Sequence, residues 1–596
     1  MIPPVEPNRA TLSFETYQPL LSDQANPIMH SSRLLLLLFV LLWTACETAP
    51  GTTDSDMVDT TATTAATDPG DPPAALLSAI DSVGVRTHIE ILSADDMEGR
   101  GTGQPGEQKA VQYIADQMQQ IGLQPGGSTG TYFQKVPLLG STPTPQGPLT
   151  FTAEDGDSLH LDFIEDFIAS TDLEDTEVST TGDLVFVGYG IDAPGYNWDS
   201  YKEVDVTDKI IVSFVNDPMA TEGEPGLFQA DTLTYYGRWT YKYEEARRRG
   251  AKGALLIHTR ETAGYPFTVL SNGASSEQIQ LATPPENPLQ LKGWITQGAA
   301  EQLAQMAGST LDEWFEMAND RDFTPQELPT QAAVDIDYEV RRFEGTNVIG
   351  KIAGQTHPNE SIVYTAHHDH LGIGQPNAEA DSIYNGAVDN ASGVAMLLEL
   401  ADAFTQAPPP ERTILFVSLT AEESGLLGAE YYARNPVLPM GEGVANINVD
   451  SGNVEGRTRD IVGIGAEKSE MMDVLRAAAA AEDMTVTPDP NPNQGYFFRS
   501  DQLAFARAGV PAVFINTGTQ YTGQPDDYAR QITEEYENND YHQPSDEFDP
   551  TWPMGGVIQQ TRVAARIGYR LAYSNLDLQW NEGEAFAQAR AEARGE

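Results

Sequence analysis

Residues 412–423 read RTILFVSLTAEE, an apolar run typical of a buried strand that ends in two adjacent glutamates, Glu422 and Glu423. Two further runs have the same form: SIVYTA stops before His367, and GVANINV stops before Asp450. In an open α/β sheet, ligand-binding groups collect at the carboxyl ends of the strands. The pattern therefore predicts that these side chains line one crevice.

The organisation of the chain around these runs predicts a large α/β domain with an insert. Residues 341–575, which begin just before the strand NVIGKIAG, alternate strand and helix patterns, as in a three-layer α/β/α sandwich around a mixed, mostly parallel sheet. Residues 76–150 add helical and loop patterns that we assign to the same domain. Residues 151–340, linkers included, carry short β-rich runs between Gly, Pro and aromatic loops. A chain of 596 residues is too long for one core, so we expect this insert to have its own.

The N-terminal region predicts export. Residues 29–46 contain Arg33, the ten-residue apolar run Leu34–Trp43, and small residues before Cys46. Ten residues are too few to span a bilayer, which needs roughly 20. The segment resembles a bacterial lipoprotein signal with Cys46 as the lipidated residue, although Trp43 replaces a small aliphatic residue. An ordinary cleaved signal is the alternative.

We therefore expect an exported protein, either periplasmic or a lipoprotein of the outer membrane or cell surface. Residues 1–28 have no place in a signal peptide, so Met29 is the expected start. Residues 47–75 are predicted to be a flexible linker, because they cannot bury enough apolar surface to fold. Residues 576–596 are predicted to be a polar tail.

The charge balance excludes several partners. Asp and Glu number 88 against 34 Lys and Arg, a net charge of −54 that repels nucleic acid and anionic lipid headgroups. Membrane contact is therefore expected only through a lipid anchor. A solubilising acidic shell, as in halophiles, explains the charge better than a cationic partner does. The single cysteine allows no intramolecular disulfide, and the oligomeric state stays open.

The His367–His370 segment, HHDH, suggests a metal ligand with its support. A histidine that ends a strand can offer one ring nitrogen to a metal, and Asp369, on the same side, can accept the proton of the other nitrogen. His368 is expected to point the other way. His370 is interpreted as a supporting or surface histidine rather than a ligand.

The other candidates gain weight only together. Asp389, in the loop YNGAVDNASG, can bridge two cations or cap a helix. Glu422 and Glu423 repel each other unless cations neutralise them, or they form a solvated first helical turn. Asp450 and His542 are each weak evidence of a site when taken alone. The combined set of two histidines and three carboxylates suits zinc, with cobalt or manganese able to substitute.

At this point the sequence resembles a known family. The blocks AHHDHLG, GAVDNASG, TAEESGLLGAEYY, NVDSGN and YHQPSDE are similar to the signature blocks of the co-catalytic dizinc aminopeptidase and glutamate carboxypeptidase family. The resemblance covers about 80–575 and implies a zinc exopeptidase fold with two Zn²⁺ per chain. It implies these roles: His367 and Asp450 hold one zinc, Glu423 and His542 hold the other, Asp389 bridges them, and Glu422 is the general base.

The resemblance implies three further features. The peptide bond between Asp389 and Asn390 is expected to be cis. The insert is similar to a protease-associated domain in DLVFVGYGI, DVTDKIIVSFVNDP and YEEARRRGAKGALLIHT. The segment FFRSDQLAFARAGVPAVFI resembles the substrate-pocket block, in which Gln502 replaces a common histidine. The expected pocket residues are Phe498, Arg499, Ser500, Asp501 and Tyr541.

These residues predict peptide hydrolysis. Two cations about 3.5 to 4 Å apart lower the pKa of a bridging water and polarise the scissile carbonyl, and Glu422 would move the proton to the leaving amine. We expect an aminopeptidase acting on peptides, because an acidic protein with few lysines suits a free amine. Arg499 keeps a glutamate carboxypeptidase-like carboxypeptidase or dipeptidase open. A non-catalytic receptor-like protein and a one-zinc glutaminyl cyclase are disfavoured, because every ligand position and the base are filled. Side-chain preference cannot be predicted.

Overall fold

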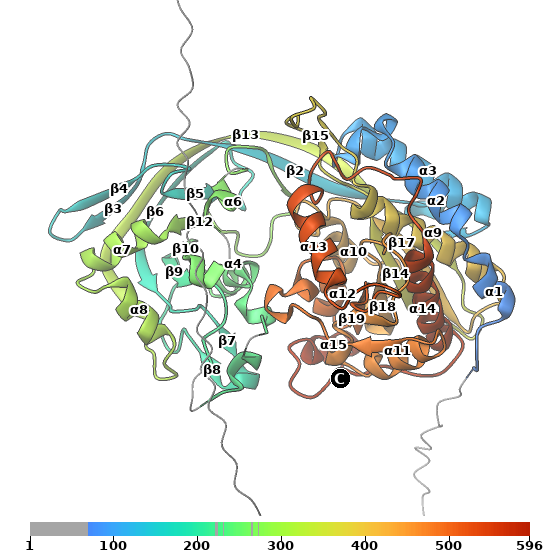
Figure 1. The fold of residues 1–596 in the computed structure, drawn as a ribbon. Helices are drawn as coiled ribbons and strands as arrows, with labels where there is room; N and C mark the ends of the chain where they lie inside the picture. Colours follow the sequence, from blue (N-terminus) through green and yellow to red (C-terminus); the bar gives the residue numbers. More distant parts are fainter. Residues whose placement is uncertain (1–68, 221–223, 231, 264–265, 272) are drawn as a thin grey trace, which may run out of the picture. The chain divides into compact units, whose positions relative to one another are not determined.

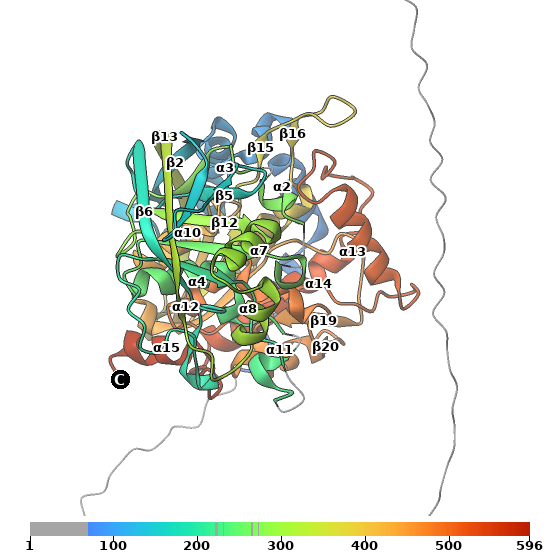
Figure 2. The same cartoon turned by 90° about the vertical axis from the view of Figure 1, so that its left-hand side faces the viewer.

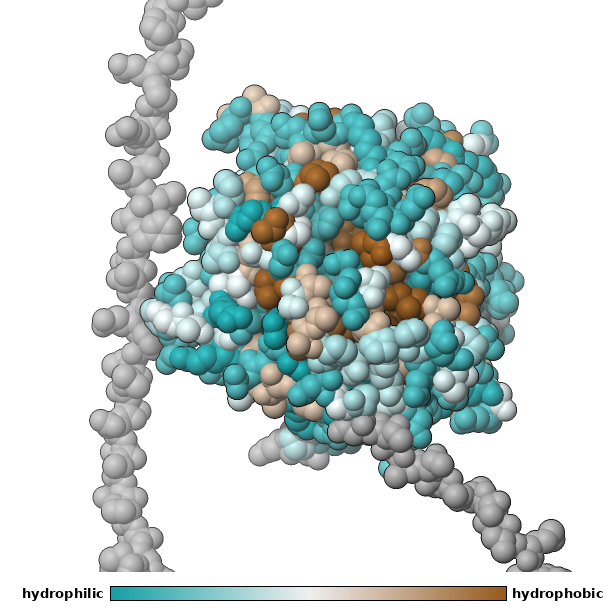
Figure 3. Space-filling view, turned by 90° about the vertical axis from the view of Figure 1, so that its right-hand side faces the viewer, coloured by the Kyte–Doolittle hydropathy of each residue, from teal (hydrophilic) through white to brown (hydrophobic). Residues whose placement is uncertain are grey.

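The computed structural model describes residues 69–596 except 221–223, 231, 264–265 and 272. The expected signal with Cys46, the expected start at Met29 and most of the expected linker lie outside the described residues. Within the described part, no helix is both long and apolar enough to cross a membrane. On the face drawn in Figure 3, hydrophilic side chains predominate and apolar ones form small separate patches.

A mostly parallel sheet forms the centre of the C-terminal part of the chain. Its four parallel strands lie in the order β17, β14, β18, β21. Antiparallel strands extend the sheet on both sides, with β13 beside β17 and β19 beside β21. The strands are β13 (Gln326–Ile352), β14 (His357–His367), β17 (Arg412–Leu419), β18 (Gly443–Asn448), β19 (Asp460–Ile464) and β21 (Ala512–Asn516). This is the expected mixed, mostly parallel sheet.

Helices cover both faces of this sheet (Figure 1). Ile362 and Tyr364 of β14 enter the larger hydrophobic core, whereas Val363, between them, enters the core of the opposite face. Burial on both faces explains why β17 and the inner part of β14, residues 361–367, are rich in apolar residues. The larger core contains α2 (Ser82–Leu92), α3 (Pro105–Ile121), α9 (Ser392–Thr405), α11 (Met471–Ala480) and α14 (Gly555–Ala572), and the opposite core contains α10 (Leu427–Arg434) and α12 (Gln502–Arg507). The predicted three-layer α/β/α sandwich is confirmed.

The residues expected to form the insert have hydrophobic cores of their own. A second set of parallel strands, in the order β6, β9, β10, β12, carries one core on each face. Figure 2 shows two of its helices, α7 and α8, in front of these strands. The elements are β6 (Glu177–Phe186), β9 (Ile210–Phe214), α4 (Trp239–Arg248), β10 (Gly253–His258), β12 (Leu291–Thr296), α7 (Gln297–Met306) and α8 (Leu311–Ala318).

One long strand belongs to both parts of the chain. Residues 326–337 of β13 pair with β6, and residues 348–352 pair with β17. The intervening residues 336–348 of β13 pair with β2 (Phe133–Pro145). Figure 1 shows the two strands running from one part to the other. The insert is therefore joined to the α/β sandwich by continuous strands rather than by flexible linkers.

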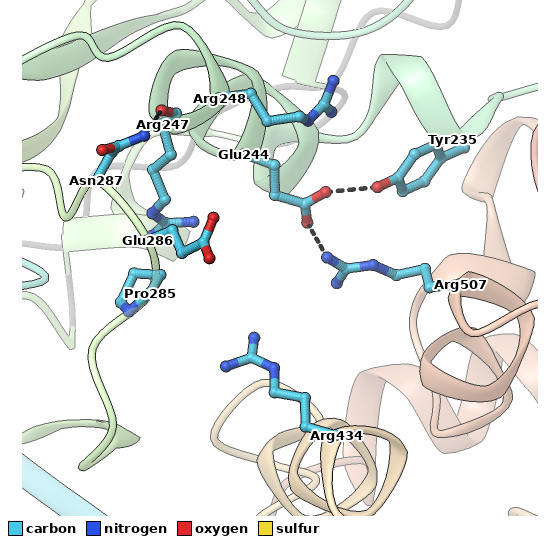
Figure 4. A pocket seen from close by; sticks show the side chains of 9 residues that line it. All are labelled: Tyr235, Glu244, Arg247, Arg248, Pro285, Glu286, Asn287, Arg434 and Arg507. Atoms are coloured by element: carbon cyan, nitrogen blue, oxygen red, sulfur yellow. Dashed lines mark hydrogen bonds and ion pairs between the residues drawn. The ribbon is translucent and has the colours of Figure 1, made fainter. Parts of the chain in front are cut away.

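The helical layer around α4 also contacts the sandwich directly. Glu244 on α4 accepts a hydrogen bond from Tyr235 and pairs with Arg507 on α12, with Nη2 and Oε1 3.3 Å apart. Figure 4 shows these side chains beside a pocket of about 360 Å³, with Arg434 of α10 on its other side. Tyr235 also packs its ring against Phe498.

The C-terminal segment differs from the expected polar tail at 576–596. Leu578, Trp580 and Phe586 are buried in the hydrophobic cores. The buried Arg590, in α15 (Ala587–Arg594), donates hydrogen bonds to backbone carbonyls of the sandwich. The composition is polar, but its few apolar residues are spaced to pack, so the segment completes the fold.

Candidate active site

The parallel order of the strands brings the predicted site residues together. β14 lies between β17 and β18, with His367 opposite Leu419 and Thr365 opposite Asn448. The residues that follow these strand ends therefore meet at one edge of the sheet. They are His367 at the end of β14, Glu422 and Glu423 after β17, and Asp450 after β18.

Three side chains form a first set of potential ligands. Nε2 of His367 lies 3.3 Å from Oδ1 of Asp389 and 3.2 Å from Oδ1 of Asp450, and the three groups are arranged as a possible metal-binding cluster. The other oxygen of Asp450 accepts a 2.6 Å hydrogen bond from the hydroxyl of Ser500. Asp450 thus has one oxygen held by the protein and one directed at His367.

Asp389 also belongs to a second set, with Glu423 and His542. Nε2 of His542 lies 3.3 Å from Oδ2 of Asp389 and 3.2 Å from Oε2 of Glu423. Asp389 therefore directs one oxygen to each set, as expected of a bridging carboxylate. The peptide bond that follows it, to Asn390, is cis, as the resemblance predicts.

The donor atoms fit zinc. Bonds of about 2.0 to 2.2 Å in a tetrahedron place neighbouring donors roughly 3.3 to 3.6 Å apart, and the four contacts above measure 3.2 or 3.3 Å. Two imidazoles and three carboxylates are also ligand types that zinc accepts. The residues present could thus hold two zinc ions that share Asp389.

The charges of the site require positive partners. Although burial opposes its protonation, hydrogen bonds with Asp389 and Glu423 raise the pKa of His542 to about 10. Burial alone would raise the pKa of Asp389, but its hydrogen bonds with His367 and His542 hold it well below the ordinary value. In the protein alone, protonated histidine therefore neutralises part of the negative charge of the carboxylates. Bound cations would fill the same role.

Glu422 differs from its neighbour Glu423. One of its carboxylate oxygens lies within 4.8 Å of a ring nitrogen of His367 and of a carboxylate oxygen of Glu423. Burial, with the nearby charges of Glu423 and Asp450, raises its pKa well above the ordinary value. A carboxylate of raised pKa is a stronger base than an ordinary glutamate.

Asp369 supports the site differently from the prediction. Nδ1 of His367 lies 3.2 Å from the backbone oxygen of Asp369 and 3.8 Å from its nearer carboxylate oxygen, which is too long for a hydrogen bond. The carboxylate instead accepts the backbone N–H groups of Glu422, at 3.0 Å, and Glu423, at 3.3 Å. Asp369 therefore holds the paired glutamates rather than the ring of His367.

His370 lies beside a predicted ligand, and with Asp389 and Glu423 it also forms a possible metal-binding cluster, a role that the sequence analysis did not favour for it. Its Nδ1 lies 2.6 Å from Oε1 of Glu423, which leaves Oε2 of Glu423 facing His542. The ring of His368 turns away from the site, as predicted, and contacts Ser418.

Asp546 was not predicted. Its carboxylate accepts the backbone N–H groups of Val388 and Asp389 and a hydrogen bond from the hydroxyl of Tyr536, and burial raises its pKa to about 6. It thus fixes the turn that carries Asp389. The sequence feature that could have indicated this role is its position four residues after His542, in the block YHQPSDE.

The residues expected to form the substrate pocket differ in exposure. Arg499 and Tyr541 are exposed, and the ring of Tyr541 stacks on that of His542 with centroids 3.9 Å apart. Phe498, Ser500 and Asp501 are buried. Apolar packing holds Phe498, and the hydrogen bond from Ser500 to Asp450 places Ser500 behind the site.

Residues 347–564 match the sequence model of Peptidase family M28. This stretch contains the six residues predicted as ligands and base. Proteins described as probable zinc metalloproteases are similar over shorter segments. The one from Pyricularia oryzae is 36% identical over 107 residues, which cover 17% of this chain and 20% of the relative. One from Pyrenophora teres f. teres is 35% identical over 119 residues, 20% of this chain and 22% of the relative. The similarity thus spans about a fifth of the relatives' length.

Solved structures show similarity over a larger share of the chain at lower identity. An aminopeptidase from Aneurinibacillus sp. strain AM-1 is 19% identical, covering 84% of this chain and 96% of its own, with a TM-score of 0.43. The zinc aminopeptidase BSAP from Bacillus subtilis is 17% identical, covering 83% and 96%, with a TM-score of 0.38.

Proposed function

We propose that this protein is an exported, zinc-dependent exopeptidase, and specifically an aminopeptidase that removes N-terminal residues from peptides. The observation that carries the proposal is the division of roles between two adjacent glutamates. Glu423 directs its oxygens to His370 and His542, whereas the carboxylate of Glu422 stays beside the cluster of His367. The match of residues 347–564 to a peptidase family supports the same reaction class.

The mechanism assigns a task to each group. His367 and Asp450 would hold one zinc ion, Glu423 and His542 the other, and Asp389 both. When bound, such a metal pair supplies a water of lowered pKa and a polarised substrate carbonyl. Glu422 then accepts the proton of the attacking water and donates it to the leaving amine. Asp369 keeps Glu422 in place through the backbone hydrogen bond at 3.0 Å.

One observation favours a second candidate, a carboxypeptidase or dipeptidase. The side chain of Arg499 is exposed, directly before the Ser500 that holds Asp450, and its guanidinium lies over the ring of Tyr496. Within the described residues it forms no ion pair with a carboxylate. Such a cation could receive the terminal carboxylate of a substrate.

A panel of peptides with free or blocked ends separates these functions. We expect the purified protein to cleave peptides with a free N-terminus, whether or not the C-terminus is amidated, and to lose this activity with a chelator. Cleavage that requires a free C-terminus would establish the second candidate. Absence of cleavage by the zinc-loaded protein, or fewer than two zinc ions per chain, would contradict the proposal. Export is part of the proposal through residues 29–46, and labelling of Cys46 by a radioactive fatty acid tests the lipid anchor.

A further inference from the structure

The segment before α3 carries a buried arginine that none of the roles above uses. The side chain of Arg100 is 1% exposed, and the fork of its guanidinium donates hydrogen bonds to four backbone carbonyls. These are the carbonyls of His368 (2.8 Å), Leu92 (2.7 Å), Asn385 (2.5 Å) and Gly386 (2.8 Å). The backbone of Arg100 itself accepts from the N–H of His370.

These carbonyls belong to the segments that carry the ligands. His368 directly follows His367, and Gly386, with a φ of 56°, begins the turn that presents Asp389. A guanidinium is planar and its N–H groups point in fixed directions, so it holds its acceptors at a defined spacing. Arg100 therefore ties the end of β14 to the Asp389 turn.

Two residues that follow Arg100 in the sequence bind the segment that carries Glu422 and Glu423, one of them through Asp369. The hydroxyl of Thr102 donates a 3.1 Å hydrogen bond to the carboxylate of Asp369, which holds the backbone of Glu422 and Glu423. Glu107 accepts from the hydroxyl of Thr420, two residues before Glu422. Residues 100–107 thus contact the segments of β14, the Asp389 turn and the paired glutamates.

Burial of this charge is unfavourable by itself. Removal from water lowers the pKa of Arg100 to about 10, while the nearby carboxylates of Asp546 and Asp389 act in the opposite direction. The four hydrogen bonds to carbonyls offset part of this cost and fix a geometry that an apolar side chain could not fix.

We propose that Arg100 is a positioning residue for the metal pair, which sets the spacing between the segment of His367 and the turn of Asp389. Its loss should weaken metal binding beyond any loss of fold stability. This inference rests on the two-metal site of the proposed function, but it does not depend on the substrate.

The test compares Arg100→Gln and Arg100→Lys with a matched control, Arg412→Gln. Arg412 is also buried, at 3% exposed, and donates to the carbonyls of Leu571 and Leu576. It lies at the end of β17 that is remote from Glu422. Zinc affinity is measured by competition with a chromogenic chelator, beside the melting temperature of the zinc-free protein and the kcat and KM for an aminoacyl anilide.

We expect Arg100→Gln to bind zinc ~10 to 100-fold more weakly at one or both sites, which is the usual effect of removing a group that orients a ligand. The kcat should fall similarly, with KM changed less than about threefold, and Arg100→Lys should recover part of the loss because its ammonium can still donate to some of the carbonyls. Arg412→Gln should lower the melting temperature and keep wild-type zinc affinity. Wild-type zinc affinity in folded Arg100 variants, or an equal loss in Arg412→Gln, would overturn the inference.

A milder variant covers the case in which Arg100→Gln does not fold. Thr102→Val keeps the side-chain volume and removes only the hydrogen bond to Asp369, so it should stay folded with kcat reduced about threefold to tenfold. An unchanged kcat and zinc affinity would contradict a bracing role for this segment. Zinc titration also separates the two hypotheses, since a wild-type protein that binds two zinc ions but cleaves no peptide would refute only the proposed function.

Discussion

Adjacent residues of the same type have different surroundings in this site. Glu422 and Glu423 share one backbone anchor, the carboxylate of Asp369. The oxygens of Glu423 are engaged by His370 and His542, whereas those of Glu422 are not. The side chains then differ in pKa, which is raised for Glu422 and lowered to about 2 for Glu423, where hydrogen bonds from the histidines outweigh burial. A base and a ligand can thus occupy consecutive positions.

Glu422→Gln separates the two roles by experiment. The amide has nearly the same shape and removes no predicted ligand, so both zinc ions should stay bound while kcat falls by about 10²- to 10⁴-fold, the usual contribution of a general base. Metal analysis and steady-state kinetics measure the two effects. Glu411→Gln, at the other end of β17, serves as the control and should leave both unchanged. A variant with near wild-type kcat would show that Glu422 is not the base.

Glu399 predicts a pH dependence of stability away from the site. Burial raises the pKa of its carboxyl in α9 to about 7, against 4.5 for an ordinary glutamate. Because the folded pKa is the higher one, this group stabilises the fold fully below pH 4.5, and that contribution is lost as the pH rises to 7. Glu399→Gln should therefore be about 2 kcal/mol more stable than wild type at pH 8 and equal to it near pH 4.5.

Chemical denaturation of the chelated protein at both pH values measures this difference, since bound zinc would add its own pH dependence. Glu90→Gln in the neighbouring α2, where the side chain is exposed, should show no difference at either pH. An equal effect of Glu399→Gln at pH 4.5 and pH 8 would mean that the carboxyl ionises normally in the fold.

Site residues could be predicted from the sequence when they lie next to a recognisable motif, but not when their role depends on partners far away in the sequence. His367, Asp389 and Asp450 could be predicted because each follows a recognisable strand or turn, and the structure brings them together. The hydrogen bonds of Arg100 to Asn385 and Gly386 could not be predicted, because the partners lie 285 and 286 residues away and only the folded chain brings them close. The sequence also did not show that Asp369 binds the backbone N–H groups of Glu422 and Glu423 rather than the ring of His367. Its spacing of two residues from His367 does not determine which N–H groups its carboxylate accepts.

At the scale of elements, the sequence pattern predicted the strands of the sandwich and the helical layers around them. It did not predict that the segment at 576–596 packs into the cores. β17 and the inner part of β14, residues 361–367, carry apolar residues on both faces, so their burial between helices could be predicted directly. The segment at 576–596 has few apolar residues and no strong periodicity. Its docking depends on the surfaces that the sandwich offers, such as the carbonyl of Gly509, which accepts from the ring nitrogen of Trp580.

Deletion of residues 577–596 should therefore destabilise the protein strongly. Leu578, Trp580 and Phe586 would all leave their cores, and each large buried side chain contributes about 2 to 4 kcal/mol. The expected result is a large fall in melting temperature or loss of soluble protein. Deletion of only Gly595 and Glu596, which are exposed, should have no effect. A full deletion that melts like wild type would restore the interpretation as a polar tail.

At the scale of the whole molecule, the metal site belongs to one set of cores. The groups that could bind zinc lie at the ends of sandwich strands or in loops outside the insert, whereas the insert has separate cores on both faces of its own strands. The two sets are joined by β13 and β2 and by the contacts of Tyr235 with Phe498 and of Glu244 with Arg507. Binding to a native state stabilises the cooperative unit that contains the site.

Calorimetry of the zinc-free protein, with zinc added stepwise, should therefore show two unfolding transitions, of which one moves. Zinc at about 1,000 times its dissociation constant contributes about 4 kcal/mol to the unit that binds it, which corresponds to roughly 5 to 10 °C for a domain of this size. The transition of the sandwich should rise by this amount while that of the insert stays in place. Asp389→Asn, which removes the bridging charge, should abolish most of the shift. Equal movement of both transitions would mean that β13 and the contacts of Tyr235 couple the cores into a single cooperative unit.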